Sequence, residues 1–140
     1  MFMLSREKCF EIVAIADRED VIRVGKAVEK CNDVTVVTLE NVLLPIKAID
    51  GAKGVEFCLG DVLATECRVL VNGREGYMLV LGDDKEKAYY GAIIDGYFDS
   101  SDDKQWLMDE LRRMEEKWKR KVAEEMAKVY ETKVEFEIID

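Results

Sequence analysis

The stretch LATECRVLVNGREGYMLVL, residues 63–81, decides the fold that we expect for this chain. At its centre lies Asn72-Gly73, a pair preferred in type I′ turns because both central residues need a positive φ. Side chains two residues apart lie on the same face of a strand. One face of the first run is formed by Leu63, Thr65, Cys67, Val69 and Val71. We therefore predict an antiparallel hairpin whose second strand ends at Leu81.

The other face of this hairpin carries Glu66 and Arg68, and Arg74 lies near its tip. Opposite charges at positions i and i+2 lie side by side on a strand. If the pair is exposed to solvent, it contributes little to stability. If the face meets another protein, the pair would set the register between the two. The sequence leaves both interpretations open.

The residues before the hairpin predict two helices. Ser5 can cap a helix over about 6–16, and Asp17 can cap a second helix over about 18–31. In the second helix, small apolar residues recur with the spacing of one buried face. Asn32 suits the left-handed conformation in which many helices end.

Three short strands are expected between these helices and the hairpin. Residues 34–41 and 42–49 are rich in β-branched and apolar residues, and residues 55–59 alternate in polarity. Residues 50–54, DGAKG, predict a loop. Pro45 cannot donate a hydrogen bond to a neighbouring strand, so the second run should be an edge strand or contain a bulge.

Two helices and a last strand are predicted after the hairpin. One helix should cover about 85–98, and a long helix, capped by Ser101, should run to about Glu131. Residues 133–140, KVEFEIID, alternate and predict a strand. The apolar stripe of the long helix consists of Leu107, Leu111, Met114, Trp118, Val122, Met126 and Val129. The element order indicates an α+β fold, one domain over 1–140, with a largely antiparallel sheet, two N-terminal helices and a long C-terminal helix.

The composition excludes several classes of function. The 140 residues carry a net charge of −9, which disfavours nucleic acid and anionic membranes as partners. The chain has no histidine and no closely spaced cysteine pair, so we expect no metal site and no histidine-based catalytic pair. The four cysteines, expected as small core residues, are Cys9, Cys31, Cys58 and Cys67. With no membrane span or signal peptide in the sequence, we expect a soluble, cytoplasmic protein.

The strand end and helix start in GYMLVLGDDKEKA, residues 76–88, resemble a phosphate-binding junction at first sight. Phosphate loops use several glycines and usually a basic residue at a helix N-terminus. Here a single glycine precedes Asp83 and Asp84, whose carboxylates would occupy the positive end of the helix dipole. We therefore expect one aspartate to cap the helix. The alternative is that one of them helps to hold Mg²⁺ on a bound nucleotide.

Two further features are open to a functional or a structural interpretation. Asp95 lies in an almost uncharged helix beside Gly91, Ala92 and Gly96, a face that permits close approach of a sheet, a helix or another subunit. A structural acid with a hydrogen-bonded partner is commoner in such a position than a catalytic acid.

The basic run at 112–121 contains Trp118, but glutamates interrupt it. We expect this tryptophan in the core and no nucleic-acid site.

Residues 57–98 resemble the G subunit of the carbon–phosphorus lyase core complex. That family carries the pattern F-x-x-G-[DE]-x-x-x-T, then G-[YW]-x-x-V-L-G-x-D, then an alanine-rich helix with an aspartate. The matching residues are Phe57, Gly60, Asp61, Thr65, Gly76, Tyr77, Val80, Leu81, Gly82, Asp84, Ala88, Ala92 and Asp95. One departure is Asp83, which stands where the family often has arginine.

This resemblance implies a role in phosphonate breakdown. The family acts with the H, I and L subunits when a phosphonate displaces adenine from MgATP to give ribose 1-phosphonate 5-triphosphate. The partners implied are the H-, I- and J-type subunits. The chain itself would bind no cofactor, MgATP being a substrate of the complex, and would supply no catalytic residue. Family-motif residues that could contact a partner or ligand are Gly60, Asp61, Thr65, Gly76, Tyr77, Gly82, Asp84 and Asp95.

Two alternatives to an assembly subunit stay open. One is a separate Mg-nucleotide-binding domain, in which Asp61, Asp84 and Asp95 surround the metal. The other is a divergent relative that acts as an interaction module and forms homo-oligomers through the long helix.

Overall fold

The computed structural model describes residues 4–139, with side chains described as far as Lys128. The helices are α1 (Arg6–Ile15), α2 (Arg18–Cys31), α3 (Lys85–Ser100) and α4 (Gln105–Ile139), and the strands are β1 (Val34–Ile49), β2 (Glu56–Val71) and β3 (Arg74–Leu81). The three strands form an antiparallel sheet in the order β1-β2-β3. The α+β fold class is therefore confirmed, with helices at both ends of the chain.

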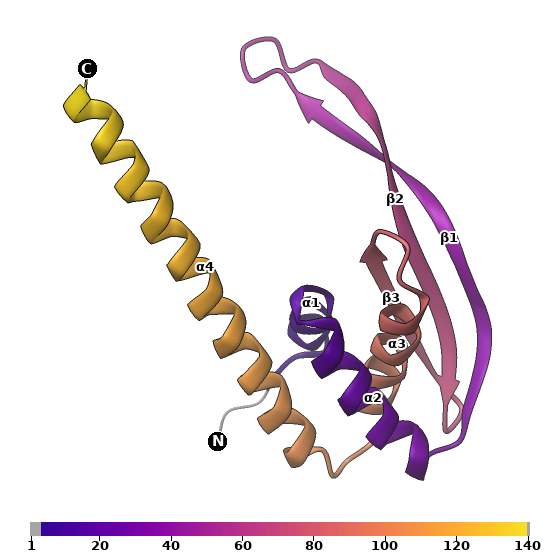
Figure 1. The fold of residues 1–140 in the computed structure, drawn as a ribbon. Coiled ribbons are helices and arrows are strands. Elements are labelled where there is room, and N and C mark those ends of the chain that lie inside the picture. The colour runs from indigo at the N-terminus through magenta and orange to yellow at the C-terminus, as the bar shows by residue number, and fades with distance from the viewer. Residues whose placement is uncertain (1–3, 140) are drawn as a thin grey trace.

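The elements are stacked in layers on one side of the sheet (Figure 1). Helix α3 packs on β2 and β3, α1 and α2 cover α3, and α4 lies against α1 and α2. The largest fully buried side chains at the centre of these layers are Ile12, Met78, Ile93, Ile94, Leu107 and Leu111. From the body, α4 and the far part of the β1–β2 hairpin both project outward (Figure 1).

The hairpin predicted around Asn72-Gly73 is confirmed. Both residues have positive φ, 51° and 83°, and Val71 lies opposite Arg74. The expected inward face is buried from Thr65 to Val71, whereas Leu63 is exposed. The strand at Pro45 is the edge of the sheet, as that proline predicted.

The strand boundaries predicted around this hairpin were too short. The two runs at 34–41 and 42–49 form one strand, β1, and the predicted break at residues 60–62 does not interrupt β2. Gly60, at φ 143°, absorbs an irregularity in the pairing there, so β2 bends without ending. The hairpin of β1 and β2 is therefore longer than the sequence suggested.

Three helix-end predictions were wrong. Asn32 has an extended backbone, and its side chain instead donates a hydrogen bond to the carbonyl of Val28. Ser101 closes α3, because its N–H donates to the carbonyl of Tyr97, and α4 begins only at Gln105. The strand expected at 133–140 is helical as far as Ile139, since no glycine or proline interrupts α4; Asp140 lies outside the described residues.

The cysteines divide into two classes. Cys9 and Cys67 are core residues as expected, but Cys31 and Cys58 are exposed, which corrects that expectation. Burial raises the pKa of the Cys9 thiol to about 12 and that of Cys67 to about 11. Thiolates are the reactive species, so the buried pair should be inert at neutral pH.

We expect iodoacetamide at pH 8 to label two cysteines of the native chain, Cys31 and Cys58, and all four after unfolding in urea. Mass spectrometry of the intact chain gives the number of adducts, and peptide mapping gives their positions. Rapid labelling of Cys9 without urea would contradict the packing of α1 described above.

Candidate functional site

The motif residues lie in two separate regions. Thr65, Gly76, Gly82, Asp84 and Asp95 lie where α3 meets β2 and β3, whereas Gly60 and Asp61 lie on the projecting part of β2. Within the described part of the chain, no three cysteine or acidic side chains converge in a way that could hold a metal ion. The arrangement therefore does not gather Asp61, Asp84 and Asp95 into one site.

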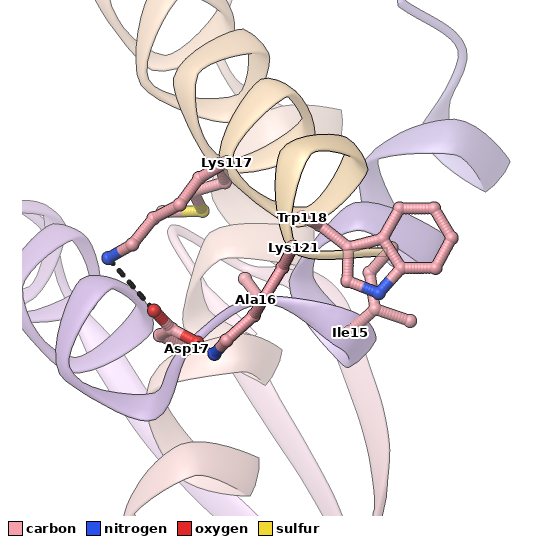
Figure 2. A pocket seen from close by; sticks show the side chains of 7 residues that line it. Ile15, Ala16, Asp17, Lys117, Trp118 and Lys121 are labelled. Carbon is pink, nitrogen blue, oxygen red and sulfur yellow. Dashed lines mark hydrogen bonds and ion pairs between the residues drawn. The ribbon is translucent and has the colours of Figure 1, made fainter. Parts of the chain in front are cut away.

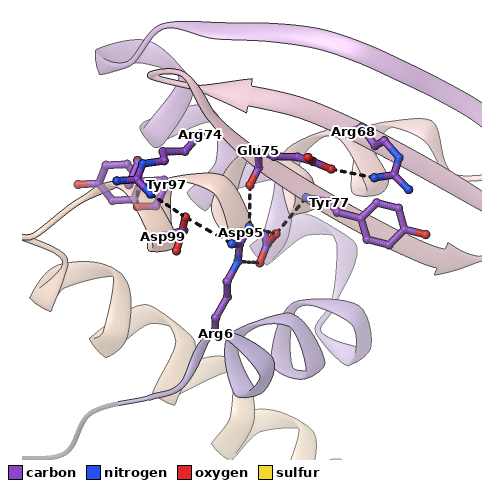
Figure 3. A network of polar contacts seen from close by, with 9 residues as sticks. Arg6, Arg68, Arg74, Glu75, Tyr77, Asp95, Tyr97 and Asp99 are labelled. Atoms are coloured by element: carbon purple, nitrogen blue, oxygen red, sulfur yellow. Dashed lines mark hydrogen bonds and ion pairs between the residues drawn. The ribbon is translucent and has the colours of Figure 1, made fainter.

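Asp95 is buried at the centre of a polar network (Figure 3). Its carboxylate accepts hydrogen bonds from Arg6 Nε at 3.1 Å, from Arg6 Nη2 at 2.9 Å and from the Tyr77 backbone N–H at 2.9 Å. Arg6 Nη2 also donates to the Glu75 carbonyl at 2.6 Å. The hydrogen bond with Asp95 raises the pKa of Arg6. Asp95 therefore joins α1, β3 and α3, an arrangement expected of a structural acid.

The outward face of the hairpin is paired within the chain as well. Tyr77 Oη donates to Glu66 at 3.1 Å, and the Arg68 guanidinium lies 4.8 Å from the centre of the Tyr77 ring. Arg68 also donates to Glu75 at 2.8 Å, whereas its nearest atom to Glu66 is 3.9 Å away (Figure 3). The predicted Glu66–Arg68 pair is thus one edge of a four-residue cluster on the sheet surface.

Thr65 joins the end of β3 to the start of α3. Its buried hydroxyl donates to the Gly82 carbonyl at 2.7 Å and accepts from the Asp84 N–H at 3.0 Å. The same oxygen lies 3.1 Å from the side-chain oxygen of Asn41 on β1. Gly82 has φ 88°, a conformation that glycine adopts without strain, and this turns the chain into the helix. Thr65 therefore fixes the strand-to-helix junction.

Asp84 caps α3, as the sequence predicted. Its Oδ1 accepts the Lys87 N–H at 3.1 Å, and both carboxylate oxygens accept from Arg18, at 3.0 and 3.2 Å. The hydrogen bond from Arg18 holds the pKa of Asp84 below its ordinary value. The helix N-terminus is thus occupied by the chain's own carboxylate, and the neighbouring Asp83 is exposed.

Replacing Thr65 with valine should lower the free energy of unfolding by about 1–3 kcal/mol, because the Asp84 N–H and the Gly82 carbonyl lose a buried partner. Valine keeps the shape of threonine, so packing changes little. Urea denaturation followed by circular dichroism measures the effect. Thr35→Val, an exposed position on β1, is the control and should change the midpoint little; equal effects of the two variants would contradict the role of this hydroxyl.

The Arg18–Asp84 pair predicts that the stability of the fold depends on pH in the acid range. Because the pKa of Asp84 in the folded chain lies below its ordinary value of 3.8, the pair stabilises the fold above pH 4, and the contribution is lost as the pH falls through the folded-state pKa. Arg18→Met should therefore lower stability at pH 7 and lose this effect near pH 3. Arg74→Met, which removes an exposed cation 3.8 Å from Asp99, is the control; the same pH dependence in both variants would argue against the Asp84 pair.

A small pocket lies where α4 meets the connection between α1 and α2 (Figure 2). Its volume is about 40 Å³, far below the roughly 300 Å³ of the smallest usual ligand sites. Lys117 contacts Asp17 at 2.8 Å across it, and Lys121 contacts the same carboxylate at 3.1 Å. Asp17 occupies the N-cap position of α2 as predicted, but its side chain does not cap the helix by a hydrogen bond, which corrects that part of the prediction, because it faces these lysines instead.

Trp118 also lines this pocket and is 37% exposed, so its expected place in the core was wrong. Met114 is the last buried residue of α4 among those whose side chains are described, and the apolar stripe continues beyond it with Met126 58% exposed. In the described residues, no helix combines the length and apolar character that a membrane span requires.

Sequence reasoning missed the two arginines that engage the motif acids. Arg6 and Arg18 lie 89 and 66 residues from their partners Asp95 and Asp84. The only feature that the two arginines share in the sequence is their position, because each is the first residue of its helix.

One comparison with known proteins identifies the family of this chain. No curated protein matches the chain. The family model described as phosphonate metabolism protein PhnG matches residues 4–139. This match includes the two leading helices, the sheet, α3 and α4. The chain therefore belongs to the PhnG family of phosphonate metabolism proteins.

Proposed function

We propose that this chain is an assembly subunit of the carbon–phosphorus lyase system, structural rather than catalytic. In this role it supports the formation of ribose 1-phosphonate 5-triphosphate from MgATP and a phosphonate. Its partners are the H-, I- and J-type subunits. The proposal rests on membership of the PhnG family together with the state of the motif side chains.

The observation that carries the structural role is that two motif carboxylates, those of Asp84 and Asp95, are already paired within the chain. Asp95 accepts three hydrogen bonds, and Asp84 is engaged by Arg18 and by the N-terminus of α3. A catalytic acid or a metal ligand needs a lone pair directed at a substrate or an ion. These carboxylates instead hold α1, α2 and α3 on the sheet, so the motif maintains the shape of the subunit.

Co-expression with the neighbouring subunits tests this role. We expect a tagged copy of this chain to purify with an I-type subunit, and we expect conversion of MgATP and a phosphonate by the H, I and L subunits to require it. Isothermal titration calorimetry of the isolated chain with MgATP should show no binding heat. Nucleotide binding by the isolated chain, or full activity of the other subunits without it, would reject the proposal.

A further inference from the structure

The β1–β2 hairpin extends well beyond the third strand. Both strands have 16 residues, but β3 has 8 and pairs with β2 only between Ala64 and Val71. We call residues 42–63 the arm; Figure 1 shows it projecting from the body as a two-stranded ribbon. Isolated two-stranded ribbons are marginally stable in water, so such an arm needs cover.

Many of the solvent-exposed side chains of the arm are apolar. Seven of them are between 41% and 69% exposed: Leu43, Ile46, Ile49, Val55, Phe57, Leu59 and Leu63. They come from both strands and from the turn region between them. Lys47 and Glu56 form an ion pair at 3.0 Å along this ribbon. Exposed apolar side chains gathered on one projecting ribbon indicate a protein interaction site.

The two free edges of the arm differ in their ability to accept another strand. The outer edge of β1 in the arm contains Pro45, which has no N–H to donate to an added strand. The edge of β2 from Glu56 to Leu63 contains neither proline nor lysine, and its neighbour β3 stops before it. The pairing with β1 shifts by one residue at Leu59, so the regular parts of this edge lie on either side of that position. A strand can therefore be added along β2, continuing the sheet beyond β3.

The charges beside this edge indicate which partner can bind. Asp61 lies on the free edge, and Asp83 follows Gly82, whose N–H donates to the Leu63 carbonyl at 2.7 Å. Both carboxylates are exposed, and neither has an ion pair within the described chain. A second copy, with its net charge of −9, would bring like charges to this point. A partner with arginine or lysine there would gain charge complementarity.

We propose that the arm docks into a non-identical subunit that adds a strand along Glu56–Leu63, covers the apolar side chains, and places cationic residues against Asp61 and Asp83. This inference rests on the proposed function, since the complex supplies the partner. The exposed Asp83 then matches a cationic contact and would select against a partner surface that is acidic at this point.

Hydrogen exchange of the wild-type complex with an I-type subunit tests the strand addition. In the isolated chain, peptides covering 56–63 should exchange rapidly, and in the complex they should be protected. Cys58 provides a second readout, because its alkylation should slow in the complex. Cys31, exposed at the end of α2, is the internal control and should be labelled at an unchanged rate.

Charge and apolar variants test the contacts. Asp61→Lys combined with Asp83→Lys should weaken the complex roughly tenfold or more, and the difference should shrink at high salt. Asp102→Lys, an exposed acid between α3 and α4, is the matched control. The double variant Phe57→Ser with Leu59→Ser should weaken the complex by a similar factor or more. Met126→Ser is the control for removal of an exposed apolar side chain. All replaced residues are exposed, so circular dichroism should show an unchanged fold.

The outcomes separate this inference from the proposed function. If the complex forms but 56–63 exchanges freely and the arm variants bind as wild type does, the arm inference is wrong and the assembly role stands. If the isolated chain self-associates with 56–63 protected, a second copy occupies the arm and the inference is wrong. If no H-, I- or J-type subunit binds, the proposed function and the arm inference both fail.

Discussion

Replacing Gly76 with alanine should lower the free energy of unfolding by about 3 kcal/mol or more, the largest effect that we expect from a single methyl group in this chain. A Cβ at this position would lie 2.1 Å from the Ala92 carbonyl oxygen and 2.7 Å from the Gly96 nitrogen. Both atoms belong to the backbone of α3, so they cannot rotate away. The helix would have to move off the sheet, and the core between them would open.

Urea denaturation of the wild type and the variant measures this effect as a shift in midpoint. Gly51→Ala is the matched control, because a Cβ there meets no atom within 4 Å. The control should change the free energy of unfolding by less than about 0.5 kcal/mol. Equal midpoints for Gly76→Ala and the control would show that α3 does not lie this close to β3.

Replacing Asp95 with alanine should cost about 3 kcal/mol of unfolding free energy. Removing one partner of a buried ion pair leaves the other uncompensated, at a cost of roughly 3–5 kcal/mol. The Arg6 side chain is 42% exposed, so water recovers part of this loss, whereas the Tyr77 N–H loses an acceptor outright. We therefore place the effect at the lower end of that range.

Asp99 provides the control for Asp95. It lies one turn further along α3 and contacts the same arginine at 3.4 Å, but its side chain is 35% exposed. Asp99→Ala should cost no more than about 1 kcal/mol. If thermal and urea denaturation give the two variants the same stability, burial does not determine the strength of this network.

The features that could be predicted from the sequence are those encoded by neighbouring residues. Asn72-Gly73 fixes the hairpin turn, and Ser5 and Asp84 cap their helices, because each depends on contacts within three residues. The small residues around Asp95 predicted close approach to a sheet, a helix or another subunit. In the structure Gly96 does lie against the sheet, where a Cβ would meet Val71 and Gly76.

The rest depends on contacts between distant parts of the chain or on the absence of a stop signal. The Arg6–Asp95 pair joins residues 89 positions apart, which no local pattern encodes. The sequence of residues 133–140 alternates like a strand, yet α4 continues as far as Ile139, and among the described residues no strand pairs with this segment. Cys58 lies in a segment whose polarity alternates along the strand. That part of β2 projects beyond the packed body, so the alternation did not indicate burial.

The exposed arm also bears on how much of this protein a cell should make. A molecule whose arm is uncovered offers a bare strand edge and a row of apolar side chains to any other chain in the same state. Its solubility would then depend on the supply of whatever covers that edge. Synthesis in step with its partners, with surplus copies removed by proteolysis, is what this ribbon would require.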